Sequence, residues 1–276
     1  MRTLGLHQIT AMSAAPIELV SIAAEVGCQQ VCVFTHVPTA GLPDTELPMS
    51  FPLVAREDVR ALQDQLRDCG VGVGNIEFFP VTSTGDIEKY RDGFEIGAAI
   101  GARRAVTHIH DADDARAIDT LGRLCDLAAE YDLRLGLEFM GLTPACSSLG
   151  RAAWFVAQVG RANIGVGVDA LHLARTGGTA ADISALPAHC FTYGQICDGV
   201  GLHLASDYLP EAMDRLLPGD GNWPLVDIIS ALPVGTSLDV EVPSPSRLSQ
   251  GISALQHARE AVERARNCID LARPVR

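Results

Sequence analysis

Four polar residues each end a short apolar run that is typical of a buried β-strand. They are Glu138, Asp169, Gln195 and Glu241, at the ends of LRLGLE, NIGVGVD, FTYGQ and TSLDVE. Because side chains alternate between the two faces of a strand, these polar residues point away from the covering helices and into the space that the strands enclose. Three carboxylates and one amide oxygen form an oxygen-rich ligand set. We expect it to hold one divalent metal ion, Mn²⁺ or Mg²⁺, with Co²⁺ also possible.

An ion of this kind has a specific chemical use beside a carbonyl group that carries a neighbouring hydroxyl. It lowers the barrier to removing the proton next to the carbonyl, because the negative charge of the enediolate develops close to the metal. Glu138 and Glu241 lie on opposite sides of the expected ring and are candidates for the acid/base pair as well as for ligands. In the alternative interpretation, each carboxylate only pairs with an arginine.

Histidines and one further carboxylate could contact a substrate near this ring. His172 comes three residues after Asp169, where we expect a loop from which it can reach a substrate hydroxyl or carbonyl. His7, Glu77 and His110 have the inward parity of their own strands. We predict that they bind substrate, although side chains that simply fill the interior, or a histidine that satisfies a local backbone group, would have the same pattern.

Apolar runs alternate with helical periodicity along the whole chain. Strands are expected near residues 3–8, 29–35, 71–79, 104–110, 133–139, 163–169, 190–197 and 236–241. Helices are expected near residues 16–26, 54–69, 86–101, 112–131, 148–159, 180–186, 223–232 and 248–271. Eight strand–helix units without a linker predict one α/β domain over residues 1–276, a single (β/α)₈ TIM barrel.

A doubly wound open sheet is the structural alternative to the barrel. It would need a glycine-rich turn after the first strand, and HQITAMSAAP offers none. Glycine and polar residues also share one strand parity, while leucine, valine and isoleucine occupy the other. In an open sheet both faces are covered by helices, so that many polar residues would be buried without partners. The pattern therefore favours a closed barrel.

Two long connections follow strands and should lie at the catalytic end of the barrel. They are residues 36–53 and 198–222, and structureless stretches of that length are usually lids or binding loops. Apolar residues around Phe51 and Leu53 indicate either a homodimer contact or a closing lid. After the last strand, PSPSR lacks the glycines that let backbone amides surround a phosphate, so a phosphorylated substrate is only weakly indicated.

The composition excludes several classes of function. A formal net charge of −13 repels phosphate backbones, so we expect no nucleic-acid partner. Lys89 is the only lysine and lies in a polar stretch, which argues against Schiff-base chemistry. No apolar run is long enough for a membrane span, and the N-terminus lacks a secretory leader, so we expect a cytoplasmic protein. The eight cysteines form no C-x-x-C pair and are expected to be reduced.

The ordered motifs resemble those of a known superfamily. LGLHQIT, LGLEF, GVDALHL, GQICD, RLLPGDGNW and a closing DVEVPS are similar to the xylose isomerase-like TIM barrels, which include sugar isomerases, epimerases and dehydratases. The resemblance covers essentially the whole chain. It implies one divalent metal held by Glu138, Asp169, Gln195 and Glu241, a role in substrate contact or proton transfer for His172, and a substrate-facing or loop-bracing role for Arg215. An exposed arginine that pairs with Asp214 or Asp220 is the alternative for Arg215.

Gln195 stands where many epimerases of this superfamily carry histidine. In this respect the chain resembles the hydroxypyruvate isomerase, inosose dehydratase and dehydroshikimate dehydratase branches. The leading hypothesis is a metal-dependent isomerase or epimerase of a small polyhydroxy carbonyl compound, such as a keto-sugar. The rival is a metal-dependent hydro-lyase of a keto-polyol or cyclic keto acid, such as inosose or 3-dehydroshikimate.

Two further classes of protein fit the barrel less well. The abasic-site endonucleases of the superfamily are implied to need a zinc cluster and an Asp-x-His after the seventh strand, but ICDGVGLHLASD contains no such motif. A barrel that only binds a polyol, without turnover, is the other possibility. The intact set of candidate ligands argues against it.

Overall fold

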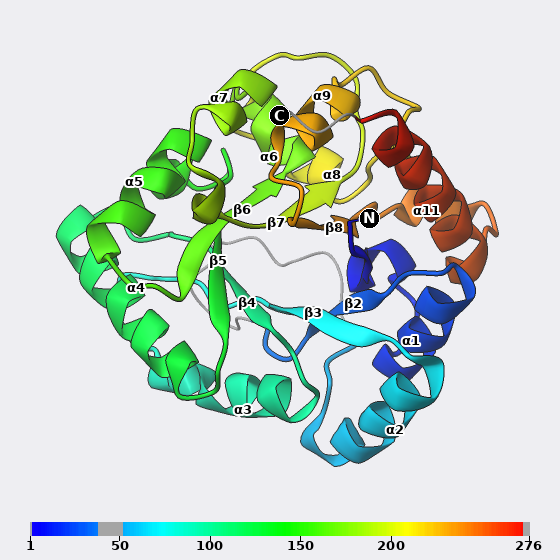
Figure 1. Cartoon of the computed structure of the whole chain (residues 1–276), viewed down its shortest axis with the longest axis horizontal. Coiled ribbons are helices and arrows are strands. Elements are labelled where there is room, and N and C mark those ends of the chain that lie inside the picture. The colour runs from blue at the N-terminus through cyan, green and yellow to red at the C-terminus, as the bar shows by residue number, and fades with distance from the viewer. Residues whose placement is uncertain (1, 38–51, 273–276) are drawn as a thin grey trace.

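The computed structural model describes residues 2–37 and 52–272, and its centre is a closed barrel of eight parallel strands (Figure 1). The strands are β1 (Leu4–His7), β2 (Gln30–Phe34), β3 (Gly72–Glu77), β4 (Arg104–Thr107), β5 (Arg134–Glu138), β6 (Ile164–Asp169), β7 (Phe191–Ile196) and β8 (Ser237–Val240). Each strand pairs with its neighbours in sequence, and β8 closes the ring on β1. This confirms the predicted (β/α)₈ barrel and excludes an open sheet.

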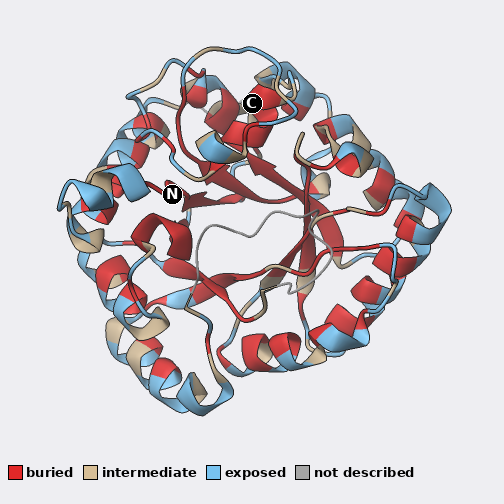
Figure 2. Cartoon of the chain, turned by 180° about the vertical axis from the view of Figure 1, so that it is seen from behind, coloured by how far each residue is buried: buried red, intermediate tan, exposed pale blue. Residues whose placement is uncertain are grey.

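Helices surround the barrel and cover its outer face. They are α1 (Pro16–Glu25), α2 (Val59–Cys69), α3 (Arg91–Ala99), α4 (Asp114–Ala129), α5 (Leu149–Val159), α6 (Ala170–Arg175), α7 (Ala180–Ser184), α8 (Leu209–Ala212), α9 (Leu225–Ala231), α10 (Pro245–Ser249) and α11 (Ala254–Leu271). Figure 2 shows buried residues along the strands and on the inward sides of the helices, with exposed residues outside. The apolar core therefore fills the layer between strands and helices, as expected for this fold.

The observed strands lie inside the eight predicted ranges, but one helix corrects a prediction about the site. The chain does not continue as a loop after β6, because α6 begins at Ala170 and contains His172. The Asp169 side chain starts this helix by accepting a hydrogen bond from the Leu171 amide at 2.6 Å. An aspartate in this cap position satisfies an amide that would otherwise have no partner. The short helices α8 and α10 were also not predicted.

The interior of the barrel is polar below the strand ends, as the strand parities predicted. The Asp239 carboxylate accepts hydrogen bonds from Gln30 at 2.8 Å and from Asn75 at 3.2 Å. Asn75 in turn accepts one from Arg104 at 2.6 Å. The carboxylate accepts hydrogen bonds from two buried amide groups, so the network links β2, β3 and β8 inside the barrel.

Two glycines create space inside the barrel for one aromatic ring. A Cβ atom added to Gly136 or to Gly167 would lie 2.3 Å from the ring of Tyr193. The two glycines stand on β5 and β6, and Tyr193 reaches across from β7. The packing of the Tyr193 ring thus requires glycine at both positions.

The long segment after β7 is held by a buried arginine. Arg175, at the end of α6, is 1% exposed and donates hydrogen bonds to the carbonyl oxygens of Gly201 and Val200, both at 3.0 Å. It also pairs with Glu211 on α8 at 2.5 Å. Val200, Leu202 and Leu204 remain exposed on this segment.

The other long connection, residues 36–53, lies mostly outside the described residues. Phe51 is not among them, and Leu53 is 43% exposed. The predicted lid or homodimer contact at this position therefore stays a prediction.

The cysteines and helices agree with two simpler expectations. All eight cysteines are free thiols, and Cys69 and Cys190 are the two that are not fully buried. In the described part of the chain, no helix combines the length and the apolar character that crossing a membrane requires.

Candidate functional site

A cavity of about 340 Å³ opens at the carboxyl ends of the strands and collects the predicted site residues. Eight of the nine line it directly: His7, Glu77, His110, Glu138, His172, Gln195, Arg215 and Glu241. The ninth, Asp169, is fully buried and contacts two of these residues, Arg215 and His172. Residues from seven strand ends or following segments thus meet in one place, as the barrel topology requires.

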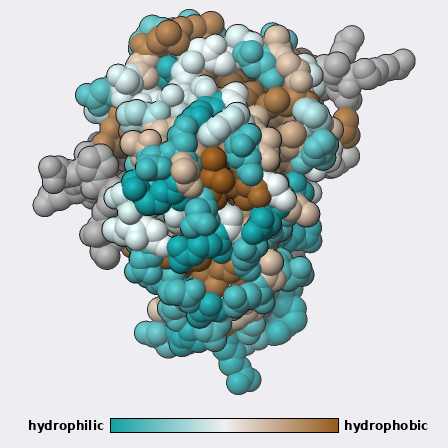
Figure 3. Space-filling view, turned by 90° about the vertical axis from the view of Figure 1, so that its left-hand side faces the viewer, coloured by the Kyte–Doolittle hydropathy of each residue, from teal (hydrophilic) through white to brown (hydrophobic). Residues whose placement is uncertain are grey.

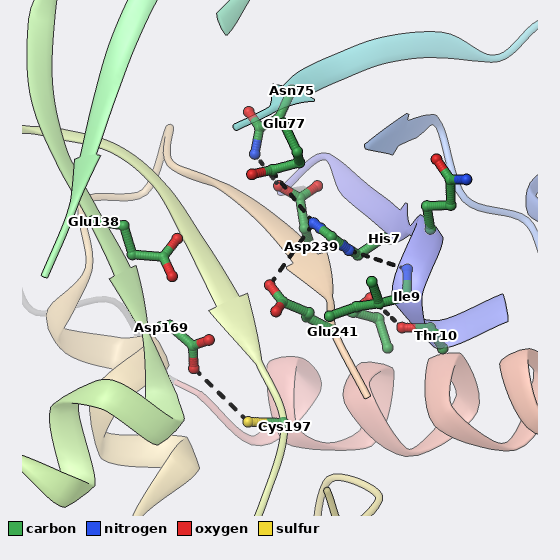
Figure 4. Close-up of polar contacts among 12 residues, drawn as sticks. His7, Ile9, Thr10, Asn75, Glu77, Glu138, Asp169, Cys197, Asp239 and Glu241 are labelled. Carbon is green, nitrogen blue, oxygen red and sulfur yellow. Dashed lines mark hydrogen bonds and ion pairs between the residues drawn. The ribbon is translucent and has the colours of Figure 1, made fainter. Parts of the chain in front are cut away.

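Three carboxylates point into the same space between their strands. Figure 4 shows Glu138 and Asp169 facing Glu241 from the other side of the barrel. Glu138 Oε2 accepts a hydrogen bond from the Tyr193 hydroxyl at 2.7 Å. Burial alone would raise the pKa of Glu138, but the contacts with His172 and the hydrogen bond from the Tyr193 hydroxyl lower it below its usual range.

Arg215 bridges two of these carboxylates. Its Nη1 donates to Asp169 Oδ2 at 2.8 Å, and its Nη2 lies 3.0 Å from Glu241 Oε1. The side chain is buried at 6% exposure, so the alternative of an exposed arginine paired with Asp214 or Asp220 is wrong. One guanidinium cannot balance three carboxylates. Burial accordingly raises the pKa of Glu241 despite the opposing effect of Arg215.

Two oxygen atoms in the cavity lack a hydrogen-bond donor among the described residues. They are Gln195 Oε1 and Glu241 Oε2, both buried, and Glu241 Oε2 lies 4.0 Å from His7 Nε2. Buried polar atoms are nearly always satisfied, so such atoms call for a partner from outside the chain. Together with the excess of carboxylate charge, these oxygens fit a divalent cation in this cavity.

His172 takes part in a chain of polar contacts above Glu138. Its Nε2 lies 3.4 Å from Glu138 Oε1, and its Nδ1 is 2.7 Å from the Tyr208 hydroxyl. Tyr208 also accepts a hydrogen bond from the Gly141 amide at 2.8 Å. Ligand atoms of Glu138, Asp169 and His172 all lie within 4.8 Å of one another, so these three residues could hold a metal ion; Glu241 is not part of this group in the described structure.

His7 and Glu77 form a buried pair on the opposite wall. His7 Nδ1 accepts the Ile9 amide hydrogen, so the ring proton is on Nε2, which lies 3.3 Å from Glu77 Oε1. Burial lowers the pKa of His7, but the charges of Glu241 and Glu77 outweigh it and raise the pKa to about 9. A second proton would have to occupy Nδ1 against the Ile9 amide. Protonation of the ring below about pH 9 therefore displaces the Ile9 amide from Nδ1, whereas the Nε2 hydrogen faces Glu77 in either state.

Two histidines of the fourth strand's extension also face the cavity. Burial lowers the pKa of His108 and that of His110 to about 4, so both rings are neutral near pH 7. The Nε2 atom of each ring is buried without a hydrogen-bond partner among the described residues. Neutral, unpaired imidazoles are suited to bind hydroxyl groups, in agreement with the predicted role of His110.

Sequence reasoning missed the apolar wall and two tyrosines. The cavity is also lined by Ile9, Phe34, Phe78, Met140, Leu142, Leu209, Ala212 and Met213. Tyr193 could have been found, because it stands two residues before Gln195 on the same strand and therefore on the same face. Tyr208 gave no signal, because it lies in the segment before α8, far from His172 in sequence.

The residues after β8 are engaged with protein groups. Ser244 and Ser246 both donate hydrogen bonds to Asp214 Oδ1, at 2.8 and 2.9 Å. Arg247 pairs with Glu260 and also donates to His257. A carboxylate therefore occupies the place where a phosphate would have to lie.

Comparisons with known proteins agree with the barrel fold. A model of the xylose isomerase-like TIM barrel family matches residues 20–270. The chain belongs to this family. A search of curated proteins found no match.

Solved structures show the same family fold over the whole chain. A zinc-bound IolI protein superposes with a TM-score of 0.80 at 17% identity, covering 100% of both chains. A xylose isomerase domain protein from Alicyclobacillus acidocaldarius has a TM-score of 0.73 at 24% identity, covering 97% of this chain and 98% of the other. An L-ribulose 3-epimerase has a TM-score of 0.73 at 15% identity, covering 99% and 96%. At these identities the likeness establishes the shared barrel.

Proposed function

We propose that this protein is a divalent-metal-dependent isomerase or epimerase of a small, neutral polyhydroxy carbonyl compound. The observation that carries the proposal is the pair of buried oxygens without a hydrogen-bond partner among the described residues, Gln195 Oε1 and Glu241 Oε2, in a cavity that Glu138 also lines and that Asp169 adjoins. The names of structural neighbours support it, because they include L-ribulose 3-epimerase and D-psicose 3-epimerase.

The four donors predicted from the sequence would hold the ion. Glu138, Asp169, Gln195 and Glu241 supply only oxygen atoms, which suits Mn²⁺ or Mg²⁺. When bound, such an ion supplies positive charge beside the carbonyl oxygen and an adjacent hydroxyl oxygen of the substrate. Arg215 keeps Asp169 and Glu241 in fixed orientations through its two nitrogen atoms.

Proton transfer is assigned to groups on the two walls of the cavity. Glu241, whose pKa is raised by burial, is the proposed base that removes the proton next to the carbonyl. On the other side Glu138, oriented by Tyr193, is the proposed partner. The lowered pKa of Glu138 keeps this carboxyl ionised, so the proton returned to the carbon comes from His172, 3.4 Å from Glu138 Oε1. His172, His7, Glu77 and His110 would bind the substrate hydroxyls.

The charges in the cavity favour a neutral substrate. Arg215 is the only arginine or lysine among the described residues of the lining, and carboxylates already occupy its Nη1 and Nη2 atoms. Glu138, Asp169, Glu241, Arg215 and a divalent cation together sum to zero charge. Glu77 and Asp207 also line the cavity and add no attraction for an acid or a phosphate. This argues for an uncharged keto-sugar or inosose over a cyclic keto acid such as 3-dehydroshikimate.

Turnover of a substrate panel tests the proposal. Neutral ketoses and inososes, with 3-dehydroshikimate for comparison, are incubated with Mn²⁺, with Mg²⁺ or with a chelator. We expect metal-dependent conversion of a neutral compound to a product of equal mass. Water loss, detected as a conjugated enone by ultraviolet absorbance, would assign the hydro-lyase reaction instead. Absence of turnover and of metal binding would overturn both reactions.

Replacement of the proposed base gives a sharper test. Glu241→Gln keeps an oxygen donor but removes the basic carboxylate, so kcat should fall by about 100-fold or more. Glu263→Gln on the exposed side of α11 is the matched control and should leave kcat unchanged. Metal content is measured in both variants. A Glu241→Gln protein that retains full activity would remove Glu241 from the mechanism.

A further inference from the structure

A second cavity lies at the opposite end of the barrel, where β5, β6 and β7 begin. It has a volume of about 780 Å³ and is lined by residues of α5, of these strand starts and of the segment before β8. Its polar side chains include Arg134, Arg161 and His189, and its described lining contains no aspartate or glutamate. In a chain with a net charge of −13, a cavity with cationic groups and no carboxylate is unusual.

Arg134 reaches into this cavity from the first position of β5. Its Nη2 donates to the carbonyl oxygen of His189 at 3.2 Å, while its Nε is buried without an acceptor in the described structure. Gly165 makes this path possible. A Cβ atom at that position would lie 3.2 Å from Arg134 Nη2 and 2.7 Å from the carbonyl oxygen of Cys190. The Arg134 side chain therefore passes over β6 at Gly165, where β6 has no side chain in the way.

A second arginine lies beside Arg134 on the neighbouring strand. Arg104 is the register partner of Arg134, and its Nη2 is also buried without an acceptor among the described residues. Neither arginine forms an ion pair with a described carboxylate, whereas Arg161 donates two hydrogen bonds to Asp126. Burial, together with the charge of Arg104, lowers the pKa of Arg134. An anion in the cavity would relieve this repulsion.

We propose that this cavity is a binding site for a small organic anion. A carboxylate or phosphate group would accept hydrogen bonds from Arg134, and an apolar body would pack against the hydrophobic lining. That lining includes Val156, Ile164 and Phe191. The surface that carries α4 and α5 faces the reader in Figure 3, where apolar areas lie between hydrophilic side chains. The site is separate from the candidate active site and does not depend on the proposed reaction.

Calorimetric titration of the purified full chain tests the site. The probes are hexanoate, inorganic phosphate and, as the uncharged control, hexanol. We expect hexanoate to bind, hexanol to bind at least about tenfold more weakly, and phosphate to show whether the apolar body is needed. In Arg134→Gln the affinity for the anion should fall about tenfold or more, whereas Arg123→Gln on α4 should match the unaltered protein.

A second pair of variants keeps the test valid if Arg134→Gln does not fold. Ala157 is an exposed residue of α5 that lines the cavity. Ala157→Glu places a carboxylate there and should abolish anion binding, while Ala157→Gln has a similar size without charge and should preserve it. Binding that is equal in all four variants, or absent from the unaltered protein, would overturn the proposal. Binding of the anion in the other cavity would give the first of these results.

Discussion

At the scale of single residues, Glu138 illustrates how the barrel fixes one carboxylate. Its own strand places it at the cavity, but its two oxygens face groups from other elements, the Tyr193 hydroxyl on β7 and His172 on α6. The Tyr193 hydroxyl has no other hydrogen-bond partner among the described residues, so it serves as a donor to Glu138 alone. The orientation of Glu138 is therefore set before any substrate enters.

Removal of that hydroxyl should weaken both stability and turnover. Tyr193→Phe keeps the ring that fills the space over Gly136 and Gly167 but removes the donor to Glu138. We expect a loss of about 1–3 kcal/mol in the free energy of unfolding, because a buried charged acceptor loses its partner. Urea denaturation measures the loss. Tyr131→Phe, which removes a hydroxyl beside the partly exposed Arg91, is the control and should cost less than about 1 kcal/mol.

The identity of the site residues could be predicted from the sequence, but their partners could not. Parity and strand ends predicted that Glu138, Gln195 and Glu241 would share one cavity, and the structure brings them together there. The pairing of Arg215 with Asp169 spans 46 residues and arises from the path of the chain after β7. Nothing local encodes such a contact, which is why an exposed arginine remained an equal alternative.

At the scale of elements, the strands were easier to predict than the short helices. Each strand is a run of apolar residues that a helix covers, so its pattern is visible in isolation. By contrast, α6 contains six residues and begins where the Asp169 side chain caps it. A helix this short has little periodicity to detect. Its start depends on Asp169, which the strand pattern indicates only as a metal ligand.

Gly167 inside the barrel should tolerate substitution far less than Gly122 in a surrounding helix. Gly167→Ala would bring Cβ to 2.3 Å from the Tyr193 ring, and we expect it to lower the free energy of unfolding by about 1–3 kcal/mol. A Cβ atom added to Gly122 in α4 would meet no neighbouring atom within 4 Å, so Gly122→Ala should raise stability by about 0.5–1 kcal/mol. Thermal or urea unfolding of both variants checks the sign. Equal effects would contradict the packing argument.

At the scale of the whole molecule, the alternation of strands and helices was sufficient to predict the closed barrel. Eight units and one polar strand face leave few other topologies. The extent of the domain over residues 1–276, the cytoplasmic location and the homodimer remain predictions. The location depends on the cell and the homodimer on a second chain. The domain extent includes residues outside the described ranges.

Buried thiols make the stability of the whole barrel sensitive to alkali. Burial raises the pKa of Cys28, Cys125 and Cys146 to about 12 in each case. The folded state keeps these thiols neutral while the unfolded chain releases their protons above about pH 8.5. Their contribution to stability is therefore complete below that pH and is lost as the pH rises toward 12.

Urea denaturation at rising pH measures this effect. Between about pH 9 and pH 12, each thiol should reduce the free energy of unfolding by up to about 1.4 kcal/mol per pH unit. A variant with alanine at the three positions should start lower in stability but show a flatter decline. If the declines of the two proteins were parallel, the thiols would not be the titrating groups.

The segment after β7 is held in place through its main chain, not through its exposed side chains. Arg175 donates hydrogen bonds to the main-chain oxygens of residues 200 and 201, and every amino acid supplies such an oxygen. The side chains of Val200, Leu202 and Leu204 take no part in these hydrogen bonds and are exposed. The rim of the barrel can thus acquire new surface chemistry by mutation at these positions while its architecture stays intact, which is the property that makes a scaffold readily evolvable.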